Sequence, residues 1–195
     1  MADSTEIIEQ APLQDRDLLQ RLSTYFDGFD ARLRQGQGWF IFNAPGPRSG
    51  RIASFIQYRL ADYQPSITSY VMPWRDFALN AYVNEVGLPT LAPVAGENQK
   101  LRREYELATH VANNTWANMI STDLLVLIGL KPTRYHEAEW LDRTLAGRCD
   151  LRLATILVTP DMPHVLQAEF ETVDPSRTYW SRIFQRMYDT SLVAL

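Results

Sequence analysis

Three uninterrupted apolar runs constrain the fold of this chain more than any other feature of its sequence. They are Trp39–Phe42 (WFIF), 123–130 (DLLVLIGL) and 153–159 (LATILVT). A run without polar alternation is typical of a strand that is covered on both faces, as in a parallel sheet. The intervening stretches repeat apolar residues at three- and four-residue steps, which indicates amphipathic helices. The chain is therefore predicted to be an α/β domain, a three-layer sandwich with a mostly parallel sheet.

The elements around these runs follow from the same periodicities and from the breaks at Gly and Pro. A helix is expected to start at Pro73, and loops are expected over 43–50 and 87–96. The other expected helices span 15–34, 51–61, 98–119, 137–149, 164–170 and 179–189, and further strands are expected at 67–72 and 191–195. Residues 1–14 are polar and are expected to be a flexible extension, which leaves 15–195 as a single domain.

Composition limits the classes of function. The chain has 195 residues, and 46% hydrophobic with 22% charged residues is ordinary globular composition. The net charge of −4 lacks the basic footprint of a protein that binds nucleic acid by itself, so any DNA contact is expected to be local or shared. No run is long enough to span a membrane, and the acidic start is no signal peptide, so the expected compartment is the cytoplasm.

The stretch 39–57 has the order of a nucleotide-binding start: an apolar strand, a loop rich in Gly and Pro, and then a helix. Such a loop offers backbone N–H groups to phosphate oxygens. The phosphate-loop motif is G-x-x-x-x-G-K-S/T. With Gly50 as its second glycine, Pro45 replaces the first glycine, Arg51 replaces the lysine and Ile52 replaces the metal-binding hydroxyl.

This loop therefore has two interpretations. It is a degenerate phosphate site, with ATP or ADP as the ligand and no well-formed Mg²⁺ site, or it is a tight strand-to-helix connection that binds no nucleotide. The candidate ligand-binding residues are Gly46, Arg48, Ser49, Gly50 and Arg51. No metal-ligand spacing is found among the His, Cys, Asp and Glu residues, and no catalytic residue is assigned.

Four collinear segments resemble the ATPase core of bacterial helicase loaders of the DnaC/DnaI type, within the AAA+ superfamily, and the related IstB-type transposition ATPases. They are YFDGFDARLRQGQGWFIF at 25–42, DLLVLIGL at 123–130, AGRCDLRLATILVTPDMP at 146–163 and WSRIFQRMYD at 180–189. The resemblance covers nearly the whole chain and implies a P-loop NTPase fold of the AAA+ kind. It also implies that DLLVLIGL is the Walker B strand and that 180–189 is the arginine-finger helix, with Arg186 as the candidate finger.

The chain departs from this family where the family carries out its chemistry. The acidic pair that ends the Walker B strand is replaced by Ile128 and Gly129, so no carboxylate there holds magnesium or activates water. The polar sensor 1 residue is replaced by Pro160. The chain ends soon after Arg186, so no C-terminal lid is expected.

These departures predict a catalytically degenerate loader-like protein, an adaptor or assembly factor in DNA replication or a mobile element. Its expected partner is a protein, such as a replicative helicase or another replication factor. Weak single-stranded DNA binding is assigned to Arg102 and Arg103, and a homo-oligomer remains open. One alternative is an active or weakly active ATPase that loads a helicase, with Asp123 or Asp161 as metal ligand. A second alternative is a structural homo-oligomer. An arginine such as Arg186 is more often a solvated helix charge than a finger, unless the protein stacks into rings or filaments.

Overall fold

The computed structural model of the chain describes residues 4–63, 66–93 and 99–195. The strands are β1 (Gly38–Ile41), β2 (Ser69–Pro73), β3 (Leu124–Ile128), β4 (Ala154–Val158) and β5 (Ser191–Ala194). The helices are α1 (Ser4–Gln10), α2 (Leu13–Asp27), α3 (Phe29–Arg34), α4 (Gly46–Ala61), α5 (Trp74–Tyr82), η1 (Val83–Gly87), α6 (Leu88–Thr90), α7 (Gln99–Ser121), α8 (Tyr135–Asp150), α9 (Pro163–Val173) and α10 (Thr178–Thr190).

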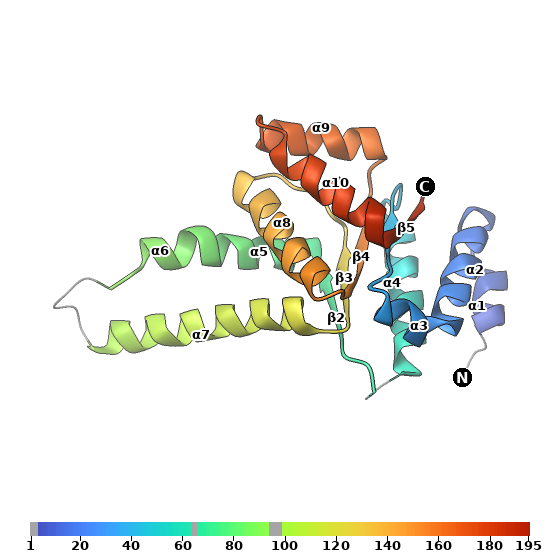
Figure 1. Cartoon of the computed structure of the whole chain (residues 1–195), viewed down its shortest axis with the longest axis horizontal. Coiled ribbons are helices and arrows are strands. Elements are labelled where there is room, and N and C mark those ends of the chain that lie inside the picture. Colours follow the sequence, from blue (N-terminus) through green and yellow to red (C-terminus); the bar gives the residue numbers. More distant parts are fainter. Residues whose placement is uncertain (1–3, 64–65, 94–98) are drawn as a thin grey trace.

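The strands form one sheet in the order β2-β3-β4-β1-β5, and all four pairings between these strands are parallel. Alternate residues of each central strand enter two separate cores. Leu124 and Val126 of β3 face the core beneath α1–α4, whereas Leu125 and Leu127 face the core beneath α5, α8, α9 and α10. The predicted three-layer α/β sandwich is confirmed, and both faces of the sheet are covered (Figure 1).

Several predicted boundaries are wrong. The helix predicted over 15–34 is two helices, because the chain breaks at Gly28 between α2 and α3. The predicted loop over 43–50 is shorter, since α4 already begins at Gly46. The predicted loop over 87–96 is helical up to Thr90, and its residues 94–96 lie outside the described part. Within the predicted flexible extension, α1 forms a helix with Ile8 buried; the flexibility of that segment stays a prediction.

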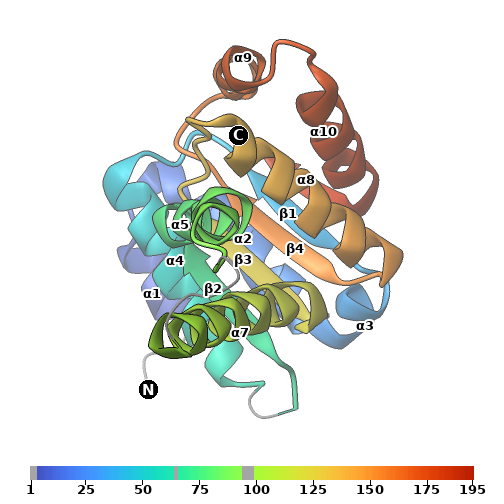
Figure 2. The same ribbon diagram turned by 90° about the vertical axis from the view of Figure 1, so that its left-hand side faces the viewer.

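The α5–α7 arm (residues 74–93 and 99–121) extends away from the sheet. Figure 1 shows α5 and α6 leading outward on one side and α7 returning beneath them, and Figure 2 views the same arm end-on. At its base the arm is joined to α8 by Arg143, whose guanidinium lies 5.0 Å from the Trp116 ring and 5.1 Å from the Trp140 ring and donates to Glu85 of η1. Toward its tip α7 is mostly exposed, with Leu101, which was predicted to face inward, 51% exposed.

Arg148 of α8 fastens the arm to the sheet from inside the protein. It is 0% exposed, and its guanidinium donates to the carbonyl oxygens of Met119 (2.6 Å) and Thr122 (2.9 Å) at the end of α7. It also donates to the carbonyl of Ala154 and the hydroxyl of Thr155 in β4. Burial lowers the pKa of Arg148 to about 10 in spite of the opposing effect of the Asp123 carboxylate, and the C-terminal carbonyls of α7 add negative potential around the guanidinium.

Arg148→Met is expected to lower the free energy of unfolding by about 3 kcal/mol, because it leaves buried carbonyl groups without donors while keeping the apolar stem. Denaturant unfolding followed by circular dichroism measures this difference. The matched control is Arg75→Met on the exposed face of α5, which is expected to change stability by less than about 0.5 kcal/mol. Equal effects of the two substitutions would contradict an anchoring role for Arg148.

Candidate functional site

The candidate site lies where β1, β3 and β4 end, because parallel strands bring their carboxyl ends to the same edge of the sheet. The loops that leave these strands are bonded to one another. Ala44 N–H donates to the carbonyl of Thr159 (2.9 Å), and Asn43 N–H donates to the carbonyl of Asp161 (3.0 Å). Gly129 N–H donates to the carbonyl of Val158 (2.8 Å). The edge is therefore a connected backbone layer at which a ligand would meet all three loops.

After β1 the chain turns sharply into α4 instead of forming a wide phosphate loop. Residues 42–45 connect the two elements, and Pro45 caps the helix in an extended conformation (φ −73°, ψ 146°). Pro47 then occupies the first turn, where a missing N–H is tolerated. The predicted loop over 43–50 is therefore too long, because Pro45 and Pro47 start the helix and do not extend the loop. Gly46, Arg48, Ser49, Gly50 and Arg51 are thus the first residues of α4.

Two of the candidate ligand-binding residues are engaged by a carboxylate of the chain itself. Asp15 of α2 is 1% exposed, and Arg51 donates to its Oδ2 from both Nε (2.8 Å) and Nη2 (2.5 Å). Arg48 Nε lies 3.0 Å from Asp15 Oδ1, and Arg48 Nη1 donates to the carbonyl of Asn43. The side chain of Arg48 is 12% exposed and that of Arg51 is 35% exposed. We refer to Asp15, Arg48 and Arg51 as the ion triad.

A polar cavity of about 460 Å³ adjoins the ion triad and is lined by Gln14, Asn43, Pro45, Arg48 and Arg51, among others. A second, more apolar cavity of about 650 Å³ lies beside it between α1, α2 and α4, where Ile7, Leu19 and Phe55 contribute to the wall. Arg51 borders both cavities. Its exposed part is the cationic group that a ligand in either cavity would meet.

The end of β3 carries backbone constraints in place of carboxylates. Ile128 is half-buried, Leu130 is 0% exposed, and Gly129 has φ +81°, a left-handed conformation that an L-residue with a Cβ adopts only with strain. Ile52, at the position where the motif requires a hydroxyl, is 0% exposed within the core beneath α4. Among the described residues no group of three His, Cys, Asp or Glu side chains has a metal-holding arrangement.

The end of β4 is tied to the β3 loop. Thr159 is 0% exposed, and its hydroxyl donates to the carbonyl of Leu130 (2.9 Å), so it does not face a ligand. Lys131 lies 2.9 Å from Glu169 and 3.6 Å from Asp161, and these carboxylates raise its pKa. Asp161, one of the two carboxylates that the sequence suggests as possible metal ligands, is thus paired with a lysine. Asp123, the other, starts β3 at the opposite edge, where it accepts from Thr68 N–H and Oγ1.

The remaining candidate residues lie away from this edge or are already paired. Arg186 of α10 is bonded to Asp142 of α8, which also pairs with Arg182 at 3.0 Å. The candidate finger is therefore held inside the protein by an 11%-exposed carboxylate. Arg102 and Arg103 are exposed on the outer part of α7. Neither the ion triad nor the Lys131 cluster was found by sequence reasoning, because both join residues that are at least 30 positions apart.

No protein-family model matches the chain, and no curated protein matches its sequence. Solved structures do match it. The DnaC helicase loader superposes with a TM-score of 0.63 at 14% identity, over 94% of this chain and 90% of that one. DnaI superposes with a TM-score of 0.59 at 15% identity, over 100% of this chain and 94% of that one. AMPPCP-bound DnaA from Aquifex aeolicus matches at 0.57 and 13%, over 88% of this chain and 46% of that one.

At these identities the likeness shows a shared fold alone, an α/β fold with a parallel five-stranded sheet that this chain has in common with these replication proteins. The predicted resemblance is confirmed at that level. No helix among the described residues is both long and apolar enough to cross a membrane.

Two glycine substitutions at this edge are expected to have opposite effects. Gly129→Ala is expected to lower the free energy of unfolding by about 1–2 kcal/mol, because of the left-handed backbone at that position. Gly50→Ala is expected to raise it by about 0.5–1 kcal/mol, because Gly50 lies within α4 and an added Cβ meets nothing within 4 Å. Thermal unfolding measures both. A loss of stability in Gly50→Ala would contradict the helical start of α4.

Proposed function

We propose that this protein is a catalytically degenerate, helicase-loader-like AAA+ protein that acts as an adaptor or assembly factor in DNA replication or a mobile element. It works through protein contacts, and its partner is a replicative helicase or another replication factor. The shared fold with the DnaC helicase loader and DnaI supports the loader-like part of this proposal. The observation that carries the adaptor part is the exposed apolar surface of the α5–α7 arm.

The chemistry of the sheet edge supports the loss of hydrolysis. Magnesium-assisted phosphoryl transfer needs a metal held beside the phosphates and a residue that orients the attacking water. Here the buried Ile52 and the left-handed Gly129 stand at positions where the family pattern carries a hydroxyl and a carboxylate. The rival ATPase would need Asp161, which is paired with Lys131, or Asp123, which lies at the far end of β3. Asp123 is therefore not placed to serve a metal next to α4, and Asp161 would have to leave Lys131 to do so.

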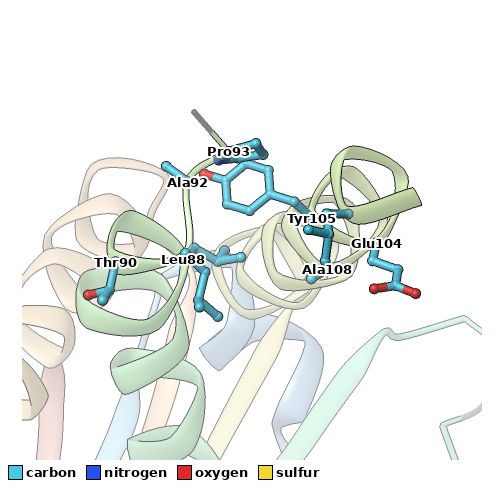
Figure 3. Close-up of a pocket in the computed structure, with 9 residues that line it drawn as sticks. Leu88, Thr90, Ala92, Pro93, Glu104, Tyr105 and Ala108 are labelled. Carbon is cyan, nitrogen blue, oxygen red and sulfur yellow. The ribbon is translucent and has the colours of Figure 1, made fainter. Parts of the chain in front are cut away.

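The α5–α7 arm carries an apolar groove between its outward and returning helices. This arm groove is lined by Leu79 and Val83 on one side, by Leu107 and Val111 on the other, and by Leu88 and Tyr105 toward the tip. Its two cavities measure about 440 and 470 Å³, and Glu104 and Ala108 border both (Figure 3 shows the tip cavity). Leu79 is 60% exposed, Leu107 64% and Val111 56%. Clustered apolar exposure of this kind marks interaction sites.

The shape and charge of the arm groove suit an amphipathic helix of a partner protein. Two helices with an apolar seam receive a third through aliphatic side chains spaced at i, i+3 and i+4. Glu104 is the acidic group common to both cavities; it is 60% exposed at its side chain and lies 3.8 Å from Lys100 of the same helix, so a Lys or Arg near the centre of the matching helix would compete with Lys100 for it. The groove is formed by α5–α7 and shares no lining residue with the cavities beside the ion triad, so partner binding in the groove is proposed to be independent of any ligand there.

Single-stranded DNA and a homo-oligomer remain secondary partners in this proposal. Arg102 and Arg103 are exposed on α7 and would supply a local contact to phosphates. Arg186 would reach a neighbouring subunit only by leaving Asp142, since its side chain is 27% exposed and already paired. Neither observation favours these partners over a protein that fills the arm groove.

The variant Leu107→Glu/Val111→Glu is expected to weaken binding to the replicative helicase of the same cell by at least about tenfold. Two unpaired carboxylates in an apolar interface cost several kcal/mol, and about 1.4 kcal/mol corresponds to a factor of ten. The control is Asn113→Glu/Ala117→Glu, which adds the same charge on exposed positions of the same helix. Calorimetry with the purified helicase measures both. Unchanged binding by the groove variant would remove the arm groove from the proposal.

Calorimetric titration with ATP is expected to give no Mg²⁺-dependent binding, and phosphate release is expected to stay at the level of buffer. The reason is the missing metal shell at Ile52 and Gly129. The titration is carried out with and without Mg²⁺, and the affinities for ATP under the two conditions are compared. Magnesium-dependent binding together with turnover would establish the rival ATPase.

A further inference from the structure

The ion triad is a built anion site that is already filled. Asp15 is 1% exposed, and each of its carboxylate oxygens faces a guanidinium: Oδ2 receives two N–H groups from Arg51, and Oδ1 lies 3.0 Å from Arg48 Nε. A carboxylate buried to this degree needs such pairing to offset its lost hydration. Two guanidinium groups thus surround one oxyanion, as they do in many phosphate and carboxylate sites, and Arg48 Nε and Asp15 Oδ1 are 3.0 Å apart without forming a hydrogen bond.

The triad holds more positive than negative charge. Two guanidinium groups surround one carboxylate, and the surplus cation faces the polar cavity of about 460 Å³ through the exposed part of Arg51. Both arginines belong to the first two turns of α4, where the helix dipole adds further positive potential. The site would therefore accept an oxyanion of higher charge than a carboxylate if Asp15 were not seated in it.

Asp15 reaches the site as part of an N-terminal segment, residues 4–15, that is fastened to the same place. Ile8 and Ala11 are buried in the core beneath α4. Arg16 Nε donates to the carbonyl of Ala11 (2.9 Å), which fixes the joint between α1 and α2. Asp15 itself lies in the first turn of α2, and Leu18, Leu19 and Leu22 of this helix are buried in the same core, so apolar contacts hold the helix in place when the carboxylate contact is lost.

We propose that Asp15 is an internal substitute for phosphate, which keeps the Arg48–Arg51 site occupied, so that an external phosphate group binds there only when Asp15 is neutralised or displaced. This inference rests on the proposed loss of nucleotide chemistry and adds its mechanism: the site is closed by the protein's own anion. A ligand that must displace Asp15 binds only the fraction of molecules in which Asp15 has left the arginines, and its apparent affinity is lowered by that fraction.

Calorimetric titration with inorganic phosphate at constant ionic strength tests the proposal on the full chain. Asp15→Asn is expected to bind phosphate at least about tenfold more tightly than the wild-type protein. The binding is expected to disappear in Asp15→Asn/Arg51→Met. Asp17→Asn, on the same helix but 85% exposed at its side chain, is the matched control and is expected to behave like the wild type. The proposal is overturned if the wild type and folded Asp15→Asn bind phosphate with the same affinity, or if neither of them binds it.

A parallel titration with ATP identifies the kind of phosphate. In Asp15→Asn, equal affinity for ATP and inorganic phosphate supports a simple oxyanion site. Tighter binding of ATP supports a site in which the second cavity adds contacts. In both cases the variant must bind the ligand more tightly than the wild type. If Asp15→Asn does not fold cooperatively, the wild-type protein and Asp15→Ser are compared instead. A dissociation constant for phosphate below about 1 mM in the wild type overturns the proposal, whereas binding by Asp15→Ser and none by the wild type supports it. Helicase binding through the arm groove is measured on different residues, so the two proposals fail separately.

Discussion

The buried guanidinium of Arg148 is the interaction on which the arrangement of this protein depends. It joins the end of α7, the start of β4 and the body of α8 through donors that all go to neutral oxygens. A cation in this setting is stable only while every acceptor stays in place. The long α7 can therefore leave the body as part of an arm, because its C-terminal end cannot shift relative to the sheet. The exposed arm groove owes its fixed position to this buried anchor.

The same use of arginine recurs where the sequence suggests function. Arg48 and Arg51 are held by Asp15, and Arg186 is held with Arg182 by Asp142. In each case a buried carboxylate from another helix pairs with the cations. These contacts stabilise helix packing, and they also lower the charge that is offered to external ligands. The arginines that the sequence offers as phosphate ligands thus hold helices together.

Much of the fold follows from local patterns, and much of the site does not. The apolar runs at β1, β3 and β4 predict buried parallel strands because such runs are typical of strands covered on both faces and are here separated by amphipathic helices. The start of α4 was misjudged because Pro45 and Pro47 suit both a loop and a first helical turn. Leu101 has the periodicity of a core residue, yet the arm carries it out of the core. The ion triad joins α2 to α4 across 36 positions, and no spacing rule predicts such a pair.

The carboxyl edge of the sheet is shaped by the backbone as well as by the side chains. Gly129 adopts φ +81° and Leu130 N–H donates to the same carbonyl of Val158 as Gly129 N–H, so the chain leaves β3 in a turn that disfavours any side chain at 129. On the other side of the edge, α4 begins at Gly46, and Arg48 and Arg51 project from its first two turns toward Asp15 of α2. The two sides of the edge are therefore fixed in different ways, because the β3 side is set by the backbone and the α4 side by an ion pair with another helix.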